Sequence, residues 1–188
     1  MKMPIAAIAL GIAVMGASIS CGPAYNLDAS HANFTPQETA LANAMFQSVE
    51  AYRASRSCGV LQRHPGLDGL ARQHSQFLRA NRGKFALQTS GVGHFGFDQR
   101  ILAADRLYHI KSIGENVATA ASRGSSTADA IVKLWKNSPP HDHNLRNSWV
   151  TTGIGVVIDE DGRAFVTQIF GTQVNTSPRE GLDRFKQH

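Results

Sequence analysis

The sequence lacks the short motifs on which several families of metal-binding proteins and enzymes depend. Only two of its 188 residues are cysteines, Cys21 and Cys58, and they form no Cys-x-x-Cys pair. A zinc knuckle or a thioredoxin-like role is therefore not expected. The sequence also contains no His-Glu-x-x-His motif of a metalloprotease and no Gly-x-Ser-x-Gly turn of an α/β-hydrolase. No local pattern indicates either class of enzyme.

The sequence also has little concentrated charge. It has 19 lysines and arginines and 14 aspartates and glutamates, for a formal net charge of +5, and only the tail with Arg179, Arg184 and Lys186 is locally basic. A basic balance favours anionic partners. No stretch, however, interleaves basic and aromatic residues in the manner of a nucleic-acid-binding surface. We therefore expect no nucleic-acid partner, and the length suits one domain.

The N-terminus has the pattern of an export signal over residues 1–20. A lysine near the start supplies positive charge, and the apolar run from Ile5 to Ala17 is too short for a membrane span. Two processing routes remain open. The small residues of Ser18-Ile19-Ser20 suit signal-peptidase cleavage before Cys21, but Ser18-Ile19-Ser20-Cys21 also resembles a lipobox, in which Cys21 carries a membrane-attaching lipid. We expect a protein that is periplasmic, an outer-membrane lipoprotein, or secreted.

The processing route decides what Cys58 can do. In an exported protein Cys21 and Cys58 can form one disulfide. If Cys21 is lipidated, Cys58 is unpaired, and its apolar neighbours Val60 and Leu61 favour a small buried side chain. Residues 21–34 are predicted to form a flexible tether.

Helices are predicted along most of the chain. Thr35-Pro36-Gln37-Glu38 is a capping box with proline at the first helical position. The apolar residues that follow at helical spacing are Leu41, Met45, Val49 and Tyr52. Further helices are expected over about 67–81, over 99–106, and from a capping box at Ser126 to the Pro139-Pro140 pair.

Strands are predicted near the end of the chain. Residues 152–159 and 163–170 form a hairpin around an Asp161-Gly162 turn. A strand within 108–118 is expected to be interrupted by Gly114. Helices first and a hairpin last predict an α+β fold or an α/β/α sandwich with an antiparallel sheet.

Five motifs occur in the order found in one known family. They are Leu67-x-x-Leu70-Ala71-x-x-His74-Ser75, His94-Phe95-Gly96, Gly114-Glu115-Asn116-Val117-Ala118, Trp135-x-x-Ser138-Pro139-x-His141-x-x-Asn144-Leu145, and Gly153-Ile154-Gly155-Val156 with Phe165-Val166-Thr167-Gln168-Ile169-Phe170-Gly171. This series resembles the bacterial branch of the CAP superfamily, whose domains are also called SCP or PR-1-like. The resemblance implies a three-layer α/β/α sandwich with a central antiparallel sheet, formed by residues 35–175 and followed by a polar tail at 176–188.

The resemblance also implies a pocket. Its family usually has two histidines and two acidic residues there, which correspond to His94, Glu115 and His141, with Ser138 in place of the second acid. Two imidazoles and one carboxylate can hold zinc or another divalent cation with a position left for water. We expect His94, Glu115, His141, Ser138 and Gln168 to line a ligand pocket, and the first three to be the candidate metal ligands and catalytic groups.

Several of these residues have a second interpretation. Glu115 is either a base or partner of a histidine, or a buried carboxylate that binds backbone amides. Gln168 either supports the pocket or makes a simple cross-strand hydrogen bond. Asn116 and Asn144 are expected to cap turns, and His74, on the apolar stripe of its helix, to be a core histidine.

Three functions follow from these expectations. The favoured one is a non-enzymatic, exported protein that binds a small apolar ligand, such as a lipid or sterol, or a protein partner. The second is a metal-assisted or Ser/His hydrolase, in which Ser138 and His141 form the nucleophile pair. The third is a structural module of the cell surface.

Overall fold

The computed structural model describes residues 34–84, 93–122, 124 and 126–173. The predicted export signal (1–20), almost all of the tether (21–34) and the polar tail (176–188) lie outside the described residues, as does Cys21. In the part of the chain that is described, no helix combines the length and the apolar character needed to cross a bilayer.

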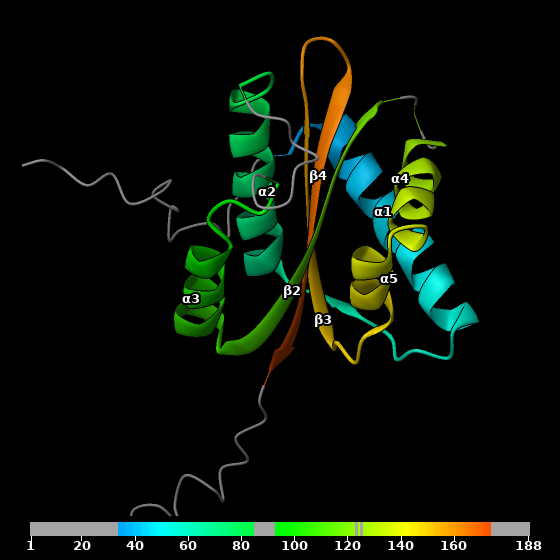
Figure 1. Cartoon of the computed structure of the whole chain (residues 1–188), viewed down its shortest axis with the longest axis vertical. Coiled ribbons are helices and arrows are strands. Elements are labelled where there is room, and N and C mark those ends of the chain that lie inside the picture. Colours follow the sequence, from blue (N-terminus) through cyan, green and yellow to red (C-terminus); the bar gives the residue numbers. More distant parts are fainter. Residues whose placement is uncertain (1–33, 85–92, 123, 125, 174–188) are drawn as a thin grey trace, which may run out of the picture.

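The described chain folds into helices on both sides of a small sheet (Figure 1). The elements in chain order are α1 (Pro36–Ser55), β1 (Gln62–Arg63), α2 (Pro65–Ala80), α3 (Phe97–Tyr108), β2 (Ile110–Ala121), α4 (Ser126–Lys136), α5 (Pro139–Arg146), β3 (Thr151–Ile158) and β4 (Arg163–Gln173).

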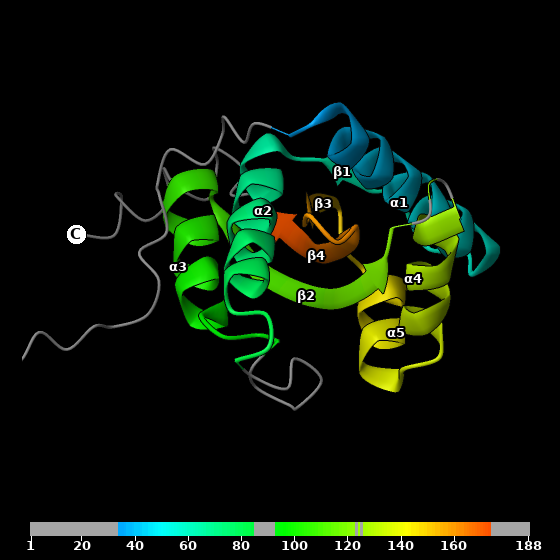
Figure 2. The same cartoon turned by 90° about the horizontal axis from the view of Figure 1, so that it is seen from above.

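The sheet has the strand order β1-β3-β4-β2. The β2–β4 and β3–β4 pairs are antiparallel, and the short β1 adds a parallel pair at one edge. Figure 2 shows α2 and α3 on one face of the sheet and α1, α4 and α5 on the other. The predicted α/β/α sandwich is therefore confirmed, with one short parallel strand added to the antiparallel sheet.

The first helix forms as its sequence predicts. Thr35 and Glu38 exchange the two hydrogen bonds of a capping box, at 2.9 and 3.2 Å, and Pro36 begins the helix. The predicted apolar stripe is buried: Leu41, Met45, Val49 and Tyr52. The buried face of α1 packs on one side of the sheet because its spacing matches the helical repeat.

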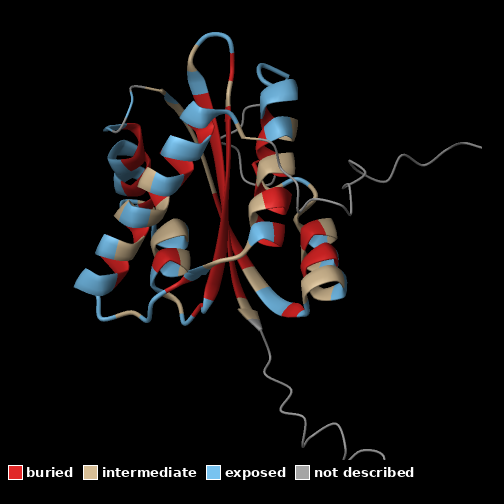
Figure 3. Ribbon diagram, turned by 180° about the vertical axis from the view of Figure 1, so that it is seen from behind, coloured by how far each residue is buried: buried red, intermediate tan, exposed pale blue. Residues whose placement is uncertain are grey.

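Both faces of the sheet are covered by apolar core. One core joins α1, α4 and α5 to the sheet, and a second joins α2 and α3 to its other face. Figure 3 shows the buried residues along the strands and on the inward sides of the helices. Helix α2 approaches β3 so closely that a Cβ at Gly155 would lie 2.1 Å from the backbone nitrogen of Arg72.

One local prediction was wrong, and one helix was not predicted. Gly114 does not interrupt β2, which is continuous from Ile110 to Ala121. A Cβ at Gly114 would lie 2.8 Å from the Trp149 ring, so glycine is required here for close packing and not for a break. Pro139-Pro140 follows the end of α4, as predicted, but the two prolines also form the first turn of α5, a helix that was not predicted.

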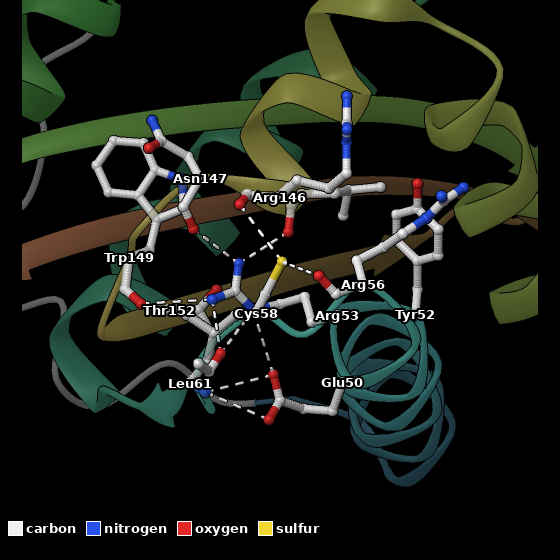
Figure 4. Close-up of polar contacts among 12 residues, drawn as sticks. Glu50, Tyr52, Arg53, Arg56, Cys58, Leu61, Arg146, Asn147, Trp149 and Thr152 are labelled. Carbon is white, nitrogen blue, oxygen red and sulfur yellow. Dashed lines mark hydrogen bonds and ion pairs between the residues drawn. The ribbon is translucent and has the colours of Figure 1, made fainter.

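A buried arginine joins the end of α1 to the C-terminal end of α5 (Figure 4). The Arg53 side chain is 1% exposed and donates to the carbonyl oxygens of Gly59, Leu145 and Asn147 at 2.7, 2.8 and 3.0 Å. The charge-assisted bonds to Leu145 and Asn147 satisfy carbonyl groups at the C-terminal end of α5, and the bond to Gly59 holds the loop after α1. Arg53 therefore fixes α5 relative to α1.

Cys58 lies beside this arginine in Figure 4 and is only partly buried. Its Sγ is 3.4 Å from the carbonyl oxygen of Arg146. The expectation of a fully buried, hydrophobe-like cysteine is therefore wrong, because the thiol lies at a polar, partly open turn.

Candidate functional site

The candidate site lies at the β2 edge of the sheet, between the two helical layers. Glu115 belongs to β2, His94 to the turn that precedes α3, and His141 to α5. Figure 2 shows that α3 and α5 lie on opposite sides of β2. The rings of His94 and His141 nevertheless approach each other, with centroids 6.4 Å apart. The fold therefore brings together the three residues that the motifs marked.

A buried ion pair forms the base of the site. The Arg100 Nε and Nη2 atoms each donate to an oxygen of Glu115 at 2.6 Å, and the two side chains are 0% and 1% exposed. Burial alone would raise the pKa of Glu115, but the hydrogen bond from His94 and the charge of Arg100 outweigh it and lower this pKa below its ordinary value. Glu115 is thus an ionised carboxylate that is neutralised by a fixed guanidinium.

His94 is oriented by this carboxylate. Its Nδ1 lies 2.9 Å from Oε1 of Glu115, and the side chain is 40% exposed. An ionised carboxylate only accepts hydrogen bonds, so Nδ1 carries the proton. In the neutral form of His94, Nε2 is then an acceptor on the other side of the ring.

His74 lies behind the ion pair and is fully buried. Its Nε2 donates to the carbonyl oxygen of Gly93 at 2.6 Å, and its Nδ1 accepts from Nη1 of Arg100 at 3.1 Å. Burial, the largest effect, lowers the pKa of His74 to about 4, so the imidazole is neutral. The predicted core histidine is confirmed, and it also supports the site.

His141 is half-buried, and burial followed by the charge of His94 lowers its pKa. Its backbone carbonyl accepts from one side-chain amide, which a second amide holds in turn. Asn116 Nδ2 donates to the carbonyl oxygen of His141 at 3.1 Å, and Asn144 Nδ2 donates to the carbonyl oxygen of Glu115 and to Oδ1 of Asn116, both at 3.0 Å. The two asparagines were expected to cap turns. They instead join α5 to β2, and this contact places His141 beside His94.

Ser138 and Gln168 were also expected in the pocket, and the structure separates only Gln168 from the site. Ser138 precedes the first turn of α5, its side chain makes no capping bond, and no hydrogen bond between the described residues joins it to His141. Gln168 pairs with Asn116 in the sheet, whereas Glu115 pairs with Ile169. Because side chains alternate along a strand, Gln168 and Glu115 point to opposite faces.

Gln168 fits its second interpretation. It is fully buried, and its Nε2 donates to Oγ1 of Thr152 on the neighbouring strand at 3.1 Å. Its Oε1 is a buried atom with no hydrogen-bond partner among the described residues. Gln168 therefore makes a cross-strand bond and does not line the site of His94.

The predicted metal ligands His94, His141 and Glu115 do not form a ligand set. Both oxygens of Glu115 are engaged by Arg100, and one of them also accepts from His94. Across the described ranges, no group of three or more His, Cys, Asp or Glu side chains is placed to hold a metal ion. Only two imidazoles remain to face a cation, fewer than the three protein ligands of catalytic zinc sites.

Arg100 is an important site residue that no sequence motif indicates. It belongs to no motif, but it lies three and four residues before the buried Ala103 and Ala104 of α3. An arginine on the apolar side of an amphipathic helix must find a buried partner. The position of Arg100 on the apolar side of α3 could therefore have predicted a buried ion pair.

Comparison with known proteins gives one family match. The sequence profile of the cysteine-rich secretory protein family, CAP, matches residues 46–170. No curated protein sequence matches the chain.

Solved bacterial structures share the fold at low sequence identity. An outer surface protein of Borrelia burgdorferi is 18% identical, with a TM-score of 0.57 over 71% of this chain and 93% of that one. An extracellular SCP-domain protein of Bacillus anthracis is 23% identical, with a TM-score of 0.52 over 75% and 45%. A cysteine-rich secretory protein of Staphylococcus aureus is 18% identical, with a TM-score of 0.54 over 73% and 40%. The chain thus spans less than half the length of the last two proteins.

Proposed function

Because this chain belongs to the cysteine-rich secretory protein (CAP) family, we propose that it is an exported, non-enzymatic binding protein. Its site at the β2 edge takes a small, mainly apolar ligand, such as a lipid or sterol, or a group presented by a protein partner. Export is supported by the N-terminal signal pattern and by similar structures described as outer surface, extracellular or secretory proteins.

The pairing of His94 with His141 carries this proposal. Two partly exposed imidazoles lie with centroids 6.4 Å apart, and the buried Arg100–Glu115 pair fixes the orientation of one of them. A few preorganised polar groups beside apolar surface are typical of ligand sites. Apolar surface is present next to His94, because the Phe95 side chain is 45% exposed.

The hydrolase alternative has less support. A serine nucleophile requires a base within hydrogen-bond reach, and Ser138 has no such bond to His141 among the described residues.

One observation favours a cation held by the two imidazoles of His94 and His141. A histidine whose Nδ1 binds a carboxylate, as in His94, presents Nε2 in the way that metal-binding histidines do.

Binding titrations of the full chain test the proposal. A fluorescent sterol and a fluorescent fatty alcohol are titrated into the wild type and into His94→Ala and His141→Ala. His143→Ala is the matched control, because His143 is an exposed residue of the same helix α5 as His141. Saturable binding that is lost in both site variants and kept in the control supports the proposal.

The other outcomes distinguish the alternatives. Zinc binding that depends on both histidines replaces the apolar-ligand proposal with a cation site. Ester or peptide hydrolysis that disappears in both variants replaces it with an enzyme. Folded variants that bind and act like the wild type in every assay favour a structural module and contradict a ligand site.

A further inference from the structure

The backbone around His94 is held on both sides by buried residues. His74 donates to the carbonyl oxygen of Gly93 at 2.6 Å, and Arg100 Nη1 donates to that of Phe95 at 3.0 Å. The ring itself is held by Glu115 at 2.9 Å. His94 is thus fixed in position and orientation by groups inside the protein, without help from a ligand.

The partners of each nitrogen determine where the protons lie. A carbonyl oxygen only accepts and a guanidinium only donates, so His74 is protonated at Nε2 and not at Nδ1. Glu115 receives both donors of Arg100 as a carboxylate, so it in turn accepts from Nδ1 of His94. Among the described residues, Nε2 of His94 has no hydrogen-bond partner. In the neutral form of the ring that atom is a lone-pair acceptor.

The groups behind His94 carry no net charge. The negative charge of Glu115 is matched by Arg100 at 2.6 Å. His74 is neutral by the hydrogen-bond pattern above. An anion at Nε2 would meet a lone pair and no uncompensated positive charge from this network, whereas an uncharged donor would complete the hydrogen-bond chain.

We propose that the site selects uncharged ligands that present a hydrogen-bond donor, a hydroxyl or an N–H group, to Nε2 of His94. Arg100 and His74 are positioning residues that impose this selection by fixing the protonated nitrogen of His94. The inference rests on the proposed function, since it specifies the chemistry of the ligand group at the same site.

A matched pair of small probes tests the selection. Phenol and benzoate have the same ring, but the first is an uncharged donor and the second an anion without a donor. Each is titrated into the 15N-histidine-labelled full chain at neutral pH, and the Nε2 resonance of His94 is followed. We expect saturable shifts with phenol and about tenfold weaker or no binding of benzoate, the scale of one hydrogen bond. Equal or tighter binding of benzoate overturns the inference.

Variants test the positioning role. Arg100→Lys retains the charge but not the two-atom contact with Glu115, and we expect it to reduce the preference for phenol at least threefold. Arg106→Lys, at an exposed site on the same helix, is the control and should change nothing. If Arg100→Lys fails to fold, His74→Gln, which keeps a donor for Gly93, should produce the same change in preference. Unchanged preference in a folded variant overturns the positioning role.

The two proposals fail in different ways. Loss of sterol and fatty-alcohol binding with the phenol preference intact contradicts the apolar-ligand function and leaves the donor selection standing. Lipid binding that depends on His94, together with equal binding of benzoate and phenol, supports the apolar-ligand function and contradicts the donor selection.

Discussion

Arg100 binds both carboxylate oxygens of Glu115 at 2.6 Å, and neither side chain is exposed to solvent by more than 1%. Glu115, which a family motif indicated, is therefore the buried counter-ion of Arg100, which belongs to none of the five motifs. This relationship explains why Glu115 orients His94 and does not join a metal-ligand set. It also makes the site rigid, because a two-bond guanidinium–carboxylate contact has a fixed geometry.

Loss of one partner of this pair should strongly destabilise the protein. Arg100→Met leaves the carboxylate of Glu115 buried without its cation, which costs about 3–5 kcal/mol of unfolding free energy. Urea unfolding at neutral pH measures the effect. The double variant Arg100→Met/Glu115→Gln should recover part of the loss. Lys111→Met breaks a solvent-exposed ion pair with Asp105 and should have little effect. A single variant as stable as this control contradicts the account.

Acid should destabilise the fold partly through His74. Its pKa is about 4 in the folded protein and 6.5 when unperturbed, so the unfolded chain binds the proton more tightly. The stabilising contribution is complete above pH 6.5 and is lost as the pH falls to about 4, with a total of about 3 kcal/mol. Urea unfolding at several pH values, compared between the wild type and His74→Gln, measures it. The variant should show a shallower decline in this range, and parallel curves would contradict the assignment.

The amide of Asn144 should hold α5 in place. Asn144→Ala removes the donor to the carbonyl oxygen of Glu115 and to Oδ1 of Asn116. Leaving buried acceptors without partners costs about 1–3 kcal/mol. Hydrogen exchange should become faster in α5, and Asn137→Ala, at an exposed position, serves as the control. Unchanged exchange in Pro139–Arg146 would show that other contacts hold this helix.

Gly114 should not tolerate a methyl group. In Gly114→Ala the new Cβ would lie 2.8 Å from the Trp149 ring, so the ring or strand β2 must shift, at a cost of about 1–3 kcal/mol. Gly59→Ala is the matched control, since nothing lies within 4 Å of a Cβ there. Thermal unfolding of both variants measures the difference. Equal stability of the two would mean that Trp149 repacks without cost.

Much of the fold could be predicted from local patterns. The α1 capping box and the Asp161-Gly162 hairpin are formed within a few residues, so the sequence contains all the contacts that define them. Helix α5 was missed because it has only eight residues with one buried, Leu145, and so has almost no apolar repeat. Strand β1 was missed because it consists of two residues paired with distant β3.

The site could be predicted only in part. The motifs identified His94, Glu115 and His141, which the fold does bring together. They did not identify Arg100, because its partners are distant in the sequence and an arginine on a helix is usually exposed. Gln168 was misplaced because its side of the strand depends on the β2–β4 register, which local sequence does not define.

The protonation of His94 and His74 in the free protein tests the central claim most directly. A long-range 1H–15N spectrum of the 15N-histidine-labelled full chain at neutral pH distinguishes the two nitrogens of each ring. The account predicts that neutral His94 carries its proton on Nδ1, against Glu115, and that His74 carries its proton on Nε2, against Gly93. A His94 ring protonated on Nε2 alone would contradict it, since Glu115 would then not be the group that orients this histidine.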